Sequence, residues 1–185
     1  MYRLIFALML NGCVHWRLSH SYMDFYEPKS QQYLELRQCS LPITVSFNSL
    51  MEHDKAKIRD GLSFWEHHAG QKLFVESNEA RVVFENSTES YYGRAGGITH
   101  NTWDSKGCIL LSRVKFMYPL ASLSEWDAQF IVRHELGHVL GLDDSYDQLN
   151  IMYQFVDINV REPSNLEVKA LRRFYGLHAP IFTNP

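Results

Sequence analysis

Two histidines and a glutamate in the segment RHELGHVLGLDDSYDQLNIMY, residues 133–153, have the spacing of a metal site. His134 and His138 are four residues apart, so on a helix their side chains project from one face, a single turn apart. Two imidazole nitrogens at that spacing can bind one zinc ion at about 2.0–2.1 Å. Glu135 would point to the flank of the metal, where its carboxylate could take a proton from a zinc-activated water and pass it to a leaving amine. The three residues predict a hydrolytic zinc site.

The chain after His138 must turn back if it is to supply a third ligand. Gly141 suits this turn, because glycine readily adopts the left-handed conformation at the end of a helix. Asp143 and Asp144 follow it directly. A third protein ligand, with the fourth position left for water, makes a catalytic site and not a closed structural one. The alternative for the bare histidine motif is a surface helix with chance histidines.

The segment HELGHVLGLDD resembles the HExxHxxGxxH signature of the metzincin zinc peptidases, and it is most similar to that of the matrixins, the matrix metalloproteinase family with its small prokaryotic relatives. In that signature the third ligand stands ten residues after the first, which is the position of Asp144. The Met-turn methionine of the family, an apolar floor beneath the histidines, corresponds to Met152. Aspartate in place of the third histidine departs from the signature, but it resembles the snapalysin group, and a carboxylate oxygen binds zinc at about 2.0–2.2 Å. In an extended segment Asp143 would point the opposite way.

The resemblance implies a zinc metalloendopeptidase that acts on proteins or peptides. One catalytic zinc ion would be held by His134, His138 and Asp144, with Glu135 as general base and then acid. A non-catalytic zinc-binding module of the same fold is one alternative, although it would have no need of Glu135. A narrow-specificity processing peptidase or an aminopeptidase is the other.

The resemblance also implies where substrate would lie. Residues 96–100 would pair with an extended peptide as an added strand, which makes Gly97 and Ile98 candidate substrate-binding residues. Tyr153 and Phe155 correspond to the wall of the pocket for the residue after the scissile bond, with core packing as the alternative. His100 loosely matches a ligand of a second, structural zinc in larger matrixins. Its partner ligands are not recognisable, and neither structural zinc nor calcium is evident.

The hydrophobic periodicity and the turn residues around this segment predict an α/β (α+β) domain, a mixed sheet of about five strands with three helices. Strands are expected at 41–47, 72–77, 80–85, 95–101 and 107–113, and a first helix at 52–69 with Gly70 as its stop. The active-site helix is expected to begin at a Ser124 cap, with buried contacts from Trp126, Phe130, Ile131 and Val132, and to end at Gly141. A last helix is expected to begin at Ser164 or Asn165 and to close on Gly176, with Leu166, Leu171 and Phe174 at helical spacing.

The length and net charge of the chain limit the number of domains and the classes of partner that we expect. A chain of 185 residues with 45% hydrophobic residues supplies one sizeable core. A net charge of −3 offers no basic patch, so we expect no nucleic-acid partner and no attraction to anionic membranes. We expect a monomer.

The first residues, MYRLIFALMLNGC, predict a short export signal over residues 1–12, because an arginine precedes an apolar run over residues 4–10. The run is too short to span a bilayer. LNGC resembles a bacterial lipobox, which predicts lipid on Cys13 and a place in the periplasm, the cell envelope or the medium. A buried N-terminal strand is the alternative. We expect a linker or short pro-segment over 13–40, the catalytic domain over 41–178 and a tail over 179–185.

Cysteine counting is compatible with export. If Cys13 carries lipid, Cys39 and Cys108 remain as a pair that could form a disulfide in an oxidising compartment. Two buried free thiols are the alternative. A third option takes Cys39 as a thiolate that caps the zinc for latency, as a pro-segment cysteine does in the family that the sequence resembles.

Overall fold

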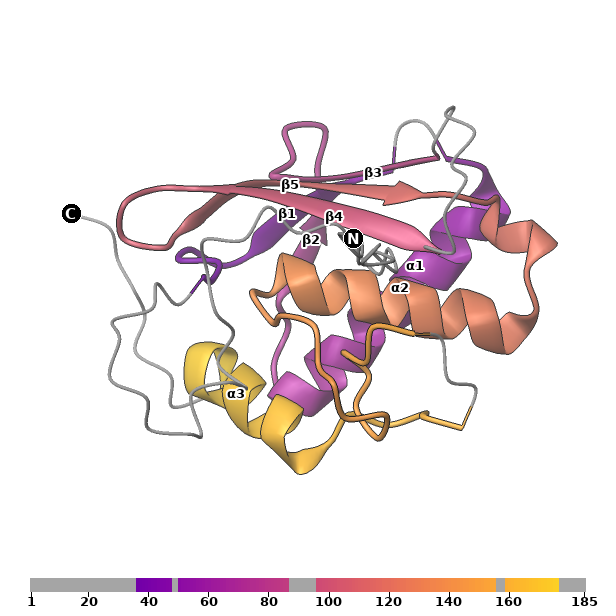
Figure 1. Ribbon diagram of the computed structural model, residues 1–185. Coiled ribbons are helices and arrows are strands. Elements are labelled where there is room, and N and C mark those ends of the chain that lie inside the picture. Colours follow the sequence, from indigo (N-terminus) through magenta and orange to yellow (C-terminus); the bar gives the residue numbers. More distant parts are fainter. Residues whose placement is uncertain (1–35, 48–49, 87–95, 156–158, 177–185) are drawn as a thin grey trace, which may run out of the picture.

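The computed structural model describes residues 36–47, 50–86, 96–155 and 159–176. In this part of the chain a five-stranded mixed sheet lies against three helices, all on one side of it (Figure 1). The predicted α/β class, strand number and helix number are therefore confirmed. In chain order the elements are β1 Ile43–Ser46, α1 Glu52–Ala69, β2 Phe74–Glu76, β3 Val82–Asn86, β4 Gly97–Trp103, β5 Ile109–Phe116, the 3-10 turn η2 Leu120–Ser122, α2 Glu125–Val139 and α3 Asn165–Tyr175.

The strands lie in the order β2-β1-β3-β5-β4. The first four are parallel, which their helical and loop crossovers require, and β4 closes the sheet as an antiparallel edge strand beside β5. Both strands of this hairpin run beyond their predicted ends, to Trp103 and Phe116. The turn between them is tightened by Asp104, whose Oδ1 accepts the N–H groups of Lys106 and Cys108 at 2.8 and 2.9 Å.

Helix α1 packs against helix α2. Its buried side, which includes Ile58, Leu62 and Trp65, faces the core as the helical spacing predicts. Gly70 ends the helix with φ +78°, the left-handed conformation that favours glycine. The indole Nε1 of Trp65 donates to the backbone oxygen of Arg133 at 2.8 Å and so ties α1 to α2.

Helix α2 packs against both β4 and α1. Ser124 caps it as predicted, because its hydroxyl accepts the N–H of Asp127 at 3.1 Å. Phe130, Ile131 and Val132 are buried, but the expectation for Trp126 is wrong: 44% of its surface is exposed. This first-turn indole faces outward, where the Arg161 guanidinium lies 4.0 Å from its ring centroid.

Helix α3 begins with a complete capping box of Ser164 and Glu167. Leu171 and Phe174 are buried as predicted, but Leu166 is 41% exposed. Glu167, one position further round the first turn, is the residue that points inward, and it is fully buried. A polar side chain with backbone partners thus takes the place expected of the leucine.

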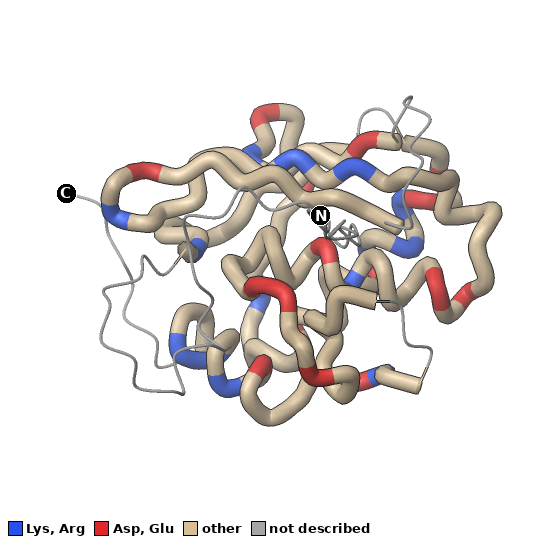
Figure 2. The backbone as a smooth tube through the Cα atoms, in the orientation of Figure 1, with Lys and Arg blue, Asp and Glu red and all other residues tan. Residues whose placement is uncertain are grey.

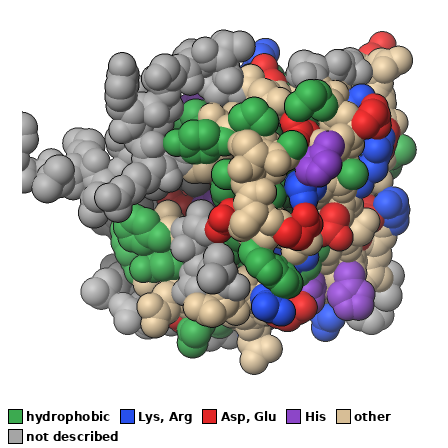
Figure 3. Space-filling view, turned by 90° about the vertical axis from the view of Figure 1, so that its right-hand side faces the viewer, with side chains coloured by type: hydrophobic (Ala, Val, Ile, Leu, Met, Phe, Trp, Pro, Cys, Tyr) green, Lys and Arg blue, Asp and Glu red, His purple; other side chains and the backbone are tan. Residues whose placement is uncertain are grey.

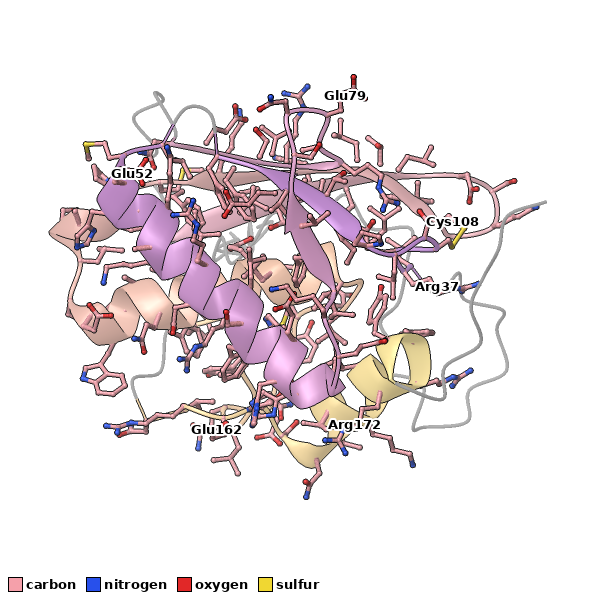
Figure 4. The ribbon with its side chains drawn as sticks, turned by 180° about the vertical axis from the view of Figure 1, so that it is seen from behind. Arg37, Glu52, Glu79, Cys108, Glu162 and Arg172 are labelled. Carbon is pink, nitrogen blue, oxygen red and sulfur yellow. A yellow bond between two sulfur atoms is a disulfide. The ribbon has the colours of Figure 1, made fainter. Side chains whose placement is uncertain are left out.

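The residues just before β1 belong to the fold, although the sequence places them in a linker. Arg37 forms a parallel bridge to Cys108, with its N–H on the oxygen of Gly107 at 3.0 Å and its oxygen on the N–H of Ile109 at 2.8 Å. Arg37 and Cys108 lie close together at one end of the sheet (Figure 4). A disulfide joins Cys39 to Cys108, so the Cys39 sulfur is not available to cap a zinc ion.

The predicted signal segment over residues 1–12 and the lipidation candidate Cys13 lie outside the described residues. Among the helices that the structure describes, none combines the length and the apolar character needed to cross a bilayer. The face in Figure 3 carries acidic, basic and hydrophobic side chains interspersed, which agrees with the small net charge of the chain.

Candidate active site

The two histidines of α2 present their Nε2 atoms to a common point. These atoms are 3.1 Å apart, and both rings are buried. The Nδ1 atom of His134 lies 3.0 Å from the backbone oxygen of Ile151, and that of His138 lies 2.8 Å from the oxygen of Leu142. Because a carbonyl oxygen only accepts, Nδ1 carries the proton of each neutral ring and Nε2 keeps its lone pair. Both rings are thus oriented as metal ligands with a fixed second contact.

Asp144 completes the cluster. Its Oδ1 lies 3.3 Å from Nε2 of His134 and 3.5 Å from Nε2 of His138, and one ligand atom from each of the three residues lies within 4.8 Å of the others. This Oδ1 is buried and accepts no hydrogen bond from the described residues. When both rings are neutral, three lone-pair atoms converge, and two nitrogens with one carboxylate oxygen form a donor set that suits zinc.

The electrostatics of the cluster also favour a positive charge beside the carboxylate of Asp144. Burial disfavours the imidazolium form of His138, but the nearby carboxylate of Asp144, together with the charge of Glu135, raises its pKa to about 9. Burial also opposes ionisation of Asp144, yet the two histidines beside it hold the pKa of this carboxyl far below its usual range. Figure 2 shows acidic residues along the segment after α2.

The neighbouring aspartate has a different place. Asp143 is buried, and its Oδ1 accepts the backbone N–H of Asp144 at 3.0 Å. It therefore braces the chain at Asp144 and is not one of the three clustered groups. Within the described residues, His134, His138 and Asp144 are the one group of three such side chains that could hold a metal ion.

The turn after α2 brings Asp144 back under the histidines. Gly141 has φ +91°, and a Cβ there would also overlap the backbone oxygen of Leu36. The N–H of Leu142 donates to the oxygen of Gly137 at 2.9 Å, which closes the turn. Beyond it, the N–H of Ser145 donates to the oxygen of Met152 at 2.6 Å, so the loop between them closes on itself.

Met152 is fully buried beneath this loop. Its backbone N–H donates to Oε1 of Glu167 at 2.7 Å, while Oε2 of Glu167 accepts the N–H of Ser164 at 2.6 Å. Burial raises the pKa of this carboxyl, although the backbone hydrogen bonds lower it. The sequence pattern did not single out Glu167, which connects the start of α3 to the loop beneath the site.

Glu135 lies beside the cluster, against β4. Its carboxylate Oε2 accepts a hydrogen bond from Oγ1 of Thr99 at 2.6 Å. Gly97 lies so close that a Cβ at that position would be 2.7 Å from Cγ of Glu135. Two residues beyond Thr99, Nδ2 of Asn101 donates to the backbone oxygen of His138 at 2.8 Å. Sequence alternation could place these three β4 residues on one face, but it could not reveal that this face meets α2.

The carboxyl end of α2 is held by residues distant in sequence. Gln38 donates from Nε2 to the oxygen of Val139 at 3.1 Å, and the Tyr175 hydroxyl donates to the oxygen of Leu140 at 3.0 Å. The same hydroxyl accepts the backbone N–H of Gln38 at 2.7 Å. Burial raises the pKa of Tyr175, so this hydroxyl keeps its proton. The free carbonyls at the end of the helix are thus satisfied by protein groups.

The candidate substrate residues are divided between two places. Gly97 and Ile98 begin the edge strand and are buried, whereas Tyr153 and Phe155 follow the methionine, with ring centroids 5.5 Å apart. Phe155 is 39% exposed, so it is not an ordinary core residue. His100 is exposed on β4 and takes no part in a metal cluster of the described residues.

The arrangement combines a group of side chains that could hold a metal ion, a buried carboxylate beside that group and an edge strand packed on the same helix. A comparison with protein-family models matches residues 26–176 to Matrixin, a range that includes every residue of this cluster. A search of curated proteins finds no match to the chain. Because the family match covers most of the 185 residues, the chain belongs to the matrixin family of zinc metallopeptidases.

Proposed function

We propose that the protein is a zinc endopeptidase in which His134, His138 and Asp144 hold one zinc ion and Glu135 transfers protons. The observation that carries the proposal is the convergence of two imidazole Nε2 atoms on a buried carboxylate oxygen that accepts no hydrogen bond. Bound zinc would supply Lewis acidity to a water molecule and to the scissile carbonyl.

Glu135 supplies the proton-transfer group. Its carboxylate lies beside the cluster on the next residue of α2, where it can accept a proton and return it to the leaving amine. Its burial places it in a low-dielectric site, in which an ionised carboxylate interacts more strongly with neighbouring charges than it does in water. A zinc module without turnover would have no use for a carboxylate in this position.

The edge strand β4 supplies the surface on which an extended substrate would lie. Among the described strands β4 pairs with β5 alone, so its outer edge has backbone groups that a peptide could pair with. Gly97 and Ile98 stand at the beginning of this edge. Tyr153 and Phe155 would line the pocket for the side chain after the scissile bond.

We also propose that the protein is exported, to the periplasm, the cell envelope or the medium, with lipid on Cys13. The N-terminal pattern supports this. The disulfide between Cys39 and Cys108 supports export independently, because structural disulfides persist in oxidising compartments and are rare in the reducing cytosol.

The test is cleavage of two sets of fluorescence-quenched peptides, one blocked at both ends and one with a free amino end, by wild type and the Glu135→Ala variant. Wild type should cleave internal bonds, lose activity with a chelator and regain it with zinc, whereas Glu135→Ala should bind zinc without cleaving. Equal and negligible rates in the two proteins on both sets of peptides would reject an enzyme in favour of a binding module. Cleavage confined to peptides with a free amino end would indicate an aminopeptidase.

A further inference from the structure

The edge strand does more than border the site, because one of its faces is bonded to the active-site helix. Gly97, Thr99 and Asn101 are two residues apart, so their side-chain positions share a face of the strand. All three meet α2: Gly97 against the side chain of Glu135, Thr99 at its carboxylate, and Asn101 at the oxygen of His138.

The contact of Thr99 differs in kind from that of Asn101. Asn101 bonds to the helix backbone and so fixes the helix, whereas Thr99 bonds to the side chain that would carry the proton. A hydroxyl has one hydrogen to donate. Oε2 of Glu135 lies 2.6 Å from Oγ1 and the backbone oxygen of the same residue lies 3.2 Å away, so the carboxylate is the main acceptor.

The environment makes this a strong bond. Thr99 is 3% exposed and Glu135 is 1% exposed. The distance falls in the range of hydroxyl bonds to an ionised carboxylate, which are shorter and stronger than bonds between neutral groups. Water competes weakly with such a bond in a buried site. The hydroxyl therefore restricts the rotation of a side chain that otherwise has three rotatable bonds.

We propose that Thr99 is a positioning residue that holds the carboxylate of Glu135 in the orientation needed for proton transfer. The inference rests on the proposed role of Glu135 as general base. It means that the strand expected to hold the substrate also holds the base, so the two keep a fixed separation. A small misplacement of a reacting group lowers the rate without loosening substrate binding.

The chain offers a matched control on the same strand. Thr102 points to the other side of β4, is exposed, and has its hydroxyl 3.5 Å from the oxygen of Leu111. Thr99→Val removes the hydroxyl at nearly constant volume, Thr99→Ser keeps it, and Thr102→Val makes the same chemical change away from the base.

We expect Thr99→Val to lower kcat by about tenfold or more, with KM within about twofold of wild type and one zinc ion per chain. Thr99→Ser should restore most of the rate, and Thr102→Val should keep it. A crystal structure of Thr99→Val should show the Glu135 carboxylate rotated away from β4. If Thr99→Val does not fold, Thr99→Ala should give the same loss of kcat.

Each result separates this inference from the proposed function. Wild-type kcat in a zinc-loaded, folded Thr99→Val or Thr99→Ala protein would overturn the positioning role while leaving the peptidase in place. An unmoved Glu135 in the variant crystal would do the same. A Thr99→Ser variant as slow as Thr99→Val would show that packing, and not the hydroxyl, matters at this position. Wild-type protein that cleaves nothing would overturn the proposed function itself, and the inference with it.

Discussion

The sulfur of Met152 occupies the space that a side chain at Gly137 would need. A Cβ built on Gly137 would overlap Sδ of Met152 and lie 3.0 Å from its Cε. The glycine stands in α2, one residue before the ligand candidate His138, and the methionine closes the loop that begins at Asp144. Contact between helix and loop thus depends on a missing side chain in the middle of a helix.

Gly137→Ala should therefore destabilise the protein, although the same change in an exposed helix is usually stabilising by about 0.5–1 kcal/mol. We expect a net loss of about 1–3 kcal/mol in the free energy of unfolding, because an added methyl group in a filled core forces its neighbours apart. Denaturant unfolding of the zinc-free protein measures this loss of stability. Gly137→Ala should cost less stability in a Met152→Ala background than in wild type, and strictly additive effects of the two changes would argue against a direct clash.

The two adjacent aspartates should behave differently towards zinc. Asp144→Ala should abolish stoichiometric zinc binding, because it removes the one carboxylate of the cluster. Asp143→Ala should keep the metal and lose about 1 kcal/mol of stability, since the N–H of Asp144 loses its acceptor. Metal content by elemental analysis, measured beside peptidase activity, checks both variants. Loss of zinc in Asp143→Ala alone would reverse the assignment.

The cluster was predictable from the sequence because its geometry is local. His134, Glu135 and His138 owe their arrangement to one helix, and Asp144 to a turn that Gly141 permits. These relations depend on helical periodicity and on the conformation of one turn, and a short segment of sequence contains the signals for both. The exposed first-turn residues Trp126 and Leu166 show the limit of periodicity, which does not fix how the start of a helix is rotated toward the core.

The supporting contacts were not predictable, because they depend on how the elements assemble. Thr99 meets Glu135 only because β4 is the edge strand that packs on α2. Gln38 and Tyr175 meet at the end of α2 although they are 137 positions apart. A polar residue in a strand or linker has no local signature of a partner so distant in sequence, and single-residue patterns carry no information about strand order.

Zinc binding should depend on pH through His138. In the zinc-free protein its pKa is raised from 6.5 to about 9, so at neutral pH a proton must leave before zinc can bind. The affinity for zinc should rise by about tenfold per pH unit as pH increases toward 9 and should level off above it. Competition with a chromophoric chelator at several pH values measures this.

The same shift affects stability without zinc. A raised histidine pKa stabilises the folded protein fully below pH 6.5, and this contribution is lost as pH rises through about 9. The Asp144 carboxylate raises this pKa, so Asp144→Asn should move both effects to lower pH. An Asp144→Asn protein whose stability varies with pH exactly as wild type does would show that the carboxylate has no such influence.

The disulfide should act on the site as well as on the fold. It closes a loop of 69 residues in sequence separation, so its loss in Cys39→Ser/Cys108→Ser should lower the free energy of unfolding by about 4 kcal/mol. Gln38, next to Cys39, donates to the carbonyl of Val139 and to the hydroxyl that bonds Leu140, so a released segment would free the end of α2. Zinc affinity should therefore fall as well.

Gln38→Ala with the disulfide intact separates the two effects: it should weaken zinc binding while losing much less stability. Zinc affinity unchanged in both variants would show that this end of the helix holds its position without the segment.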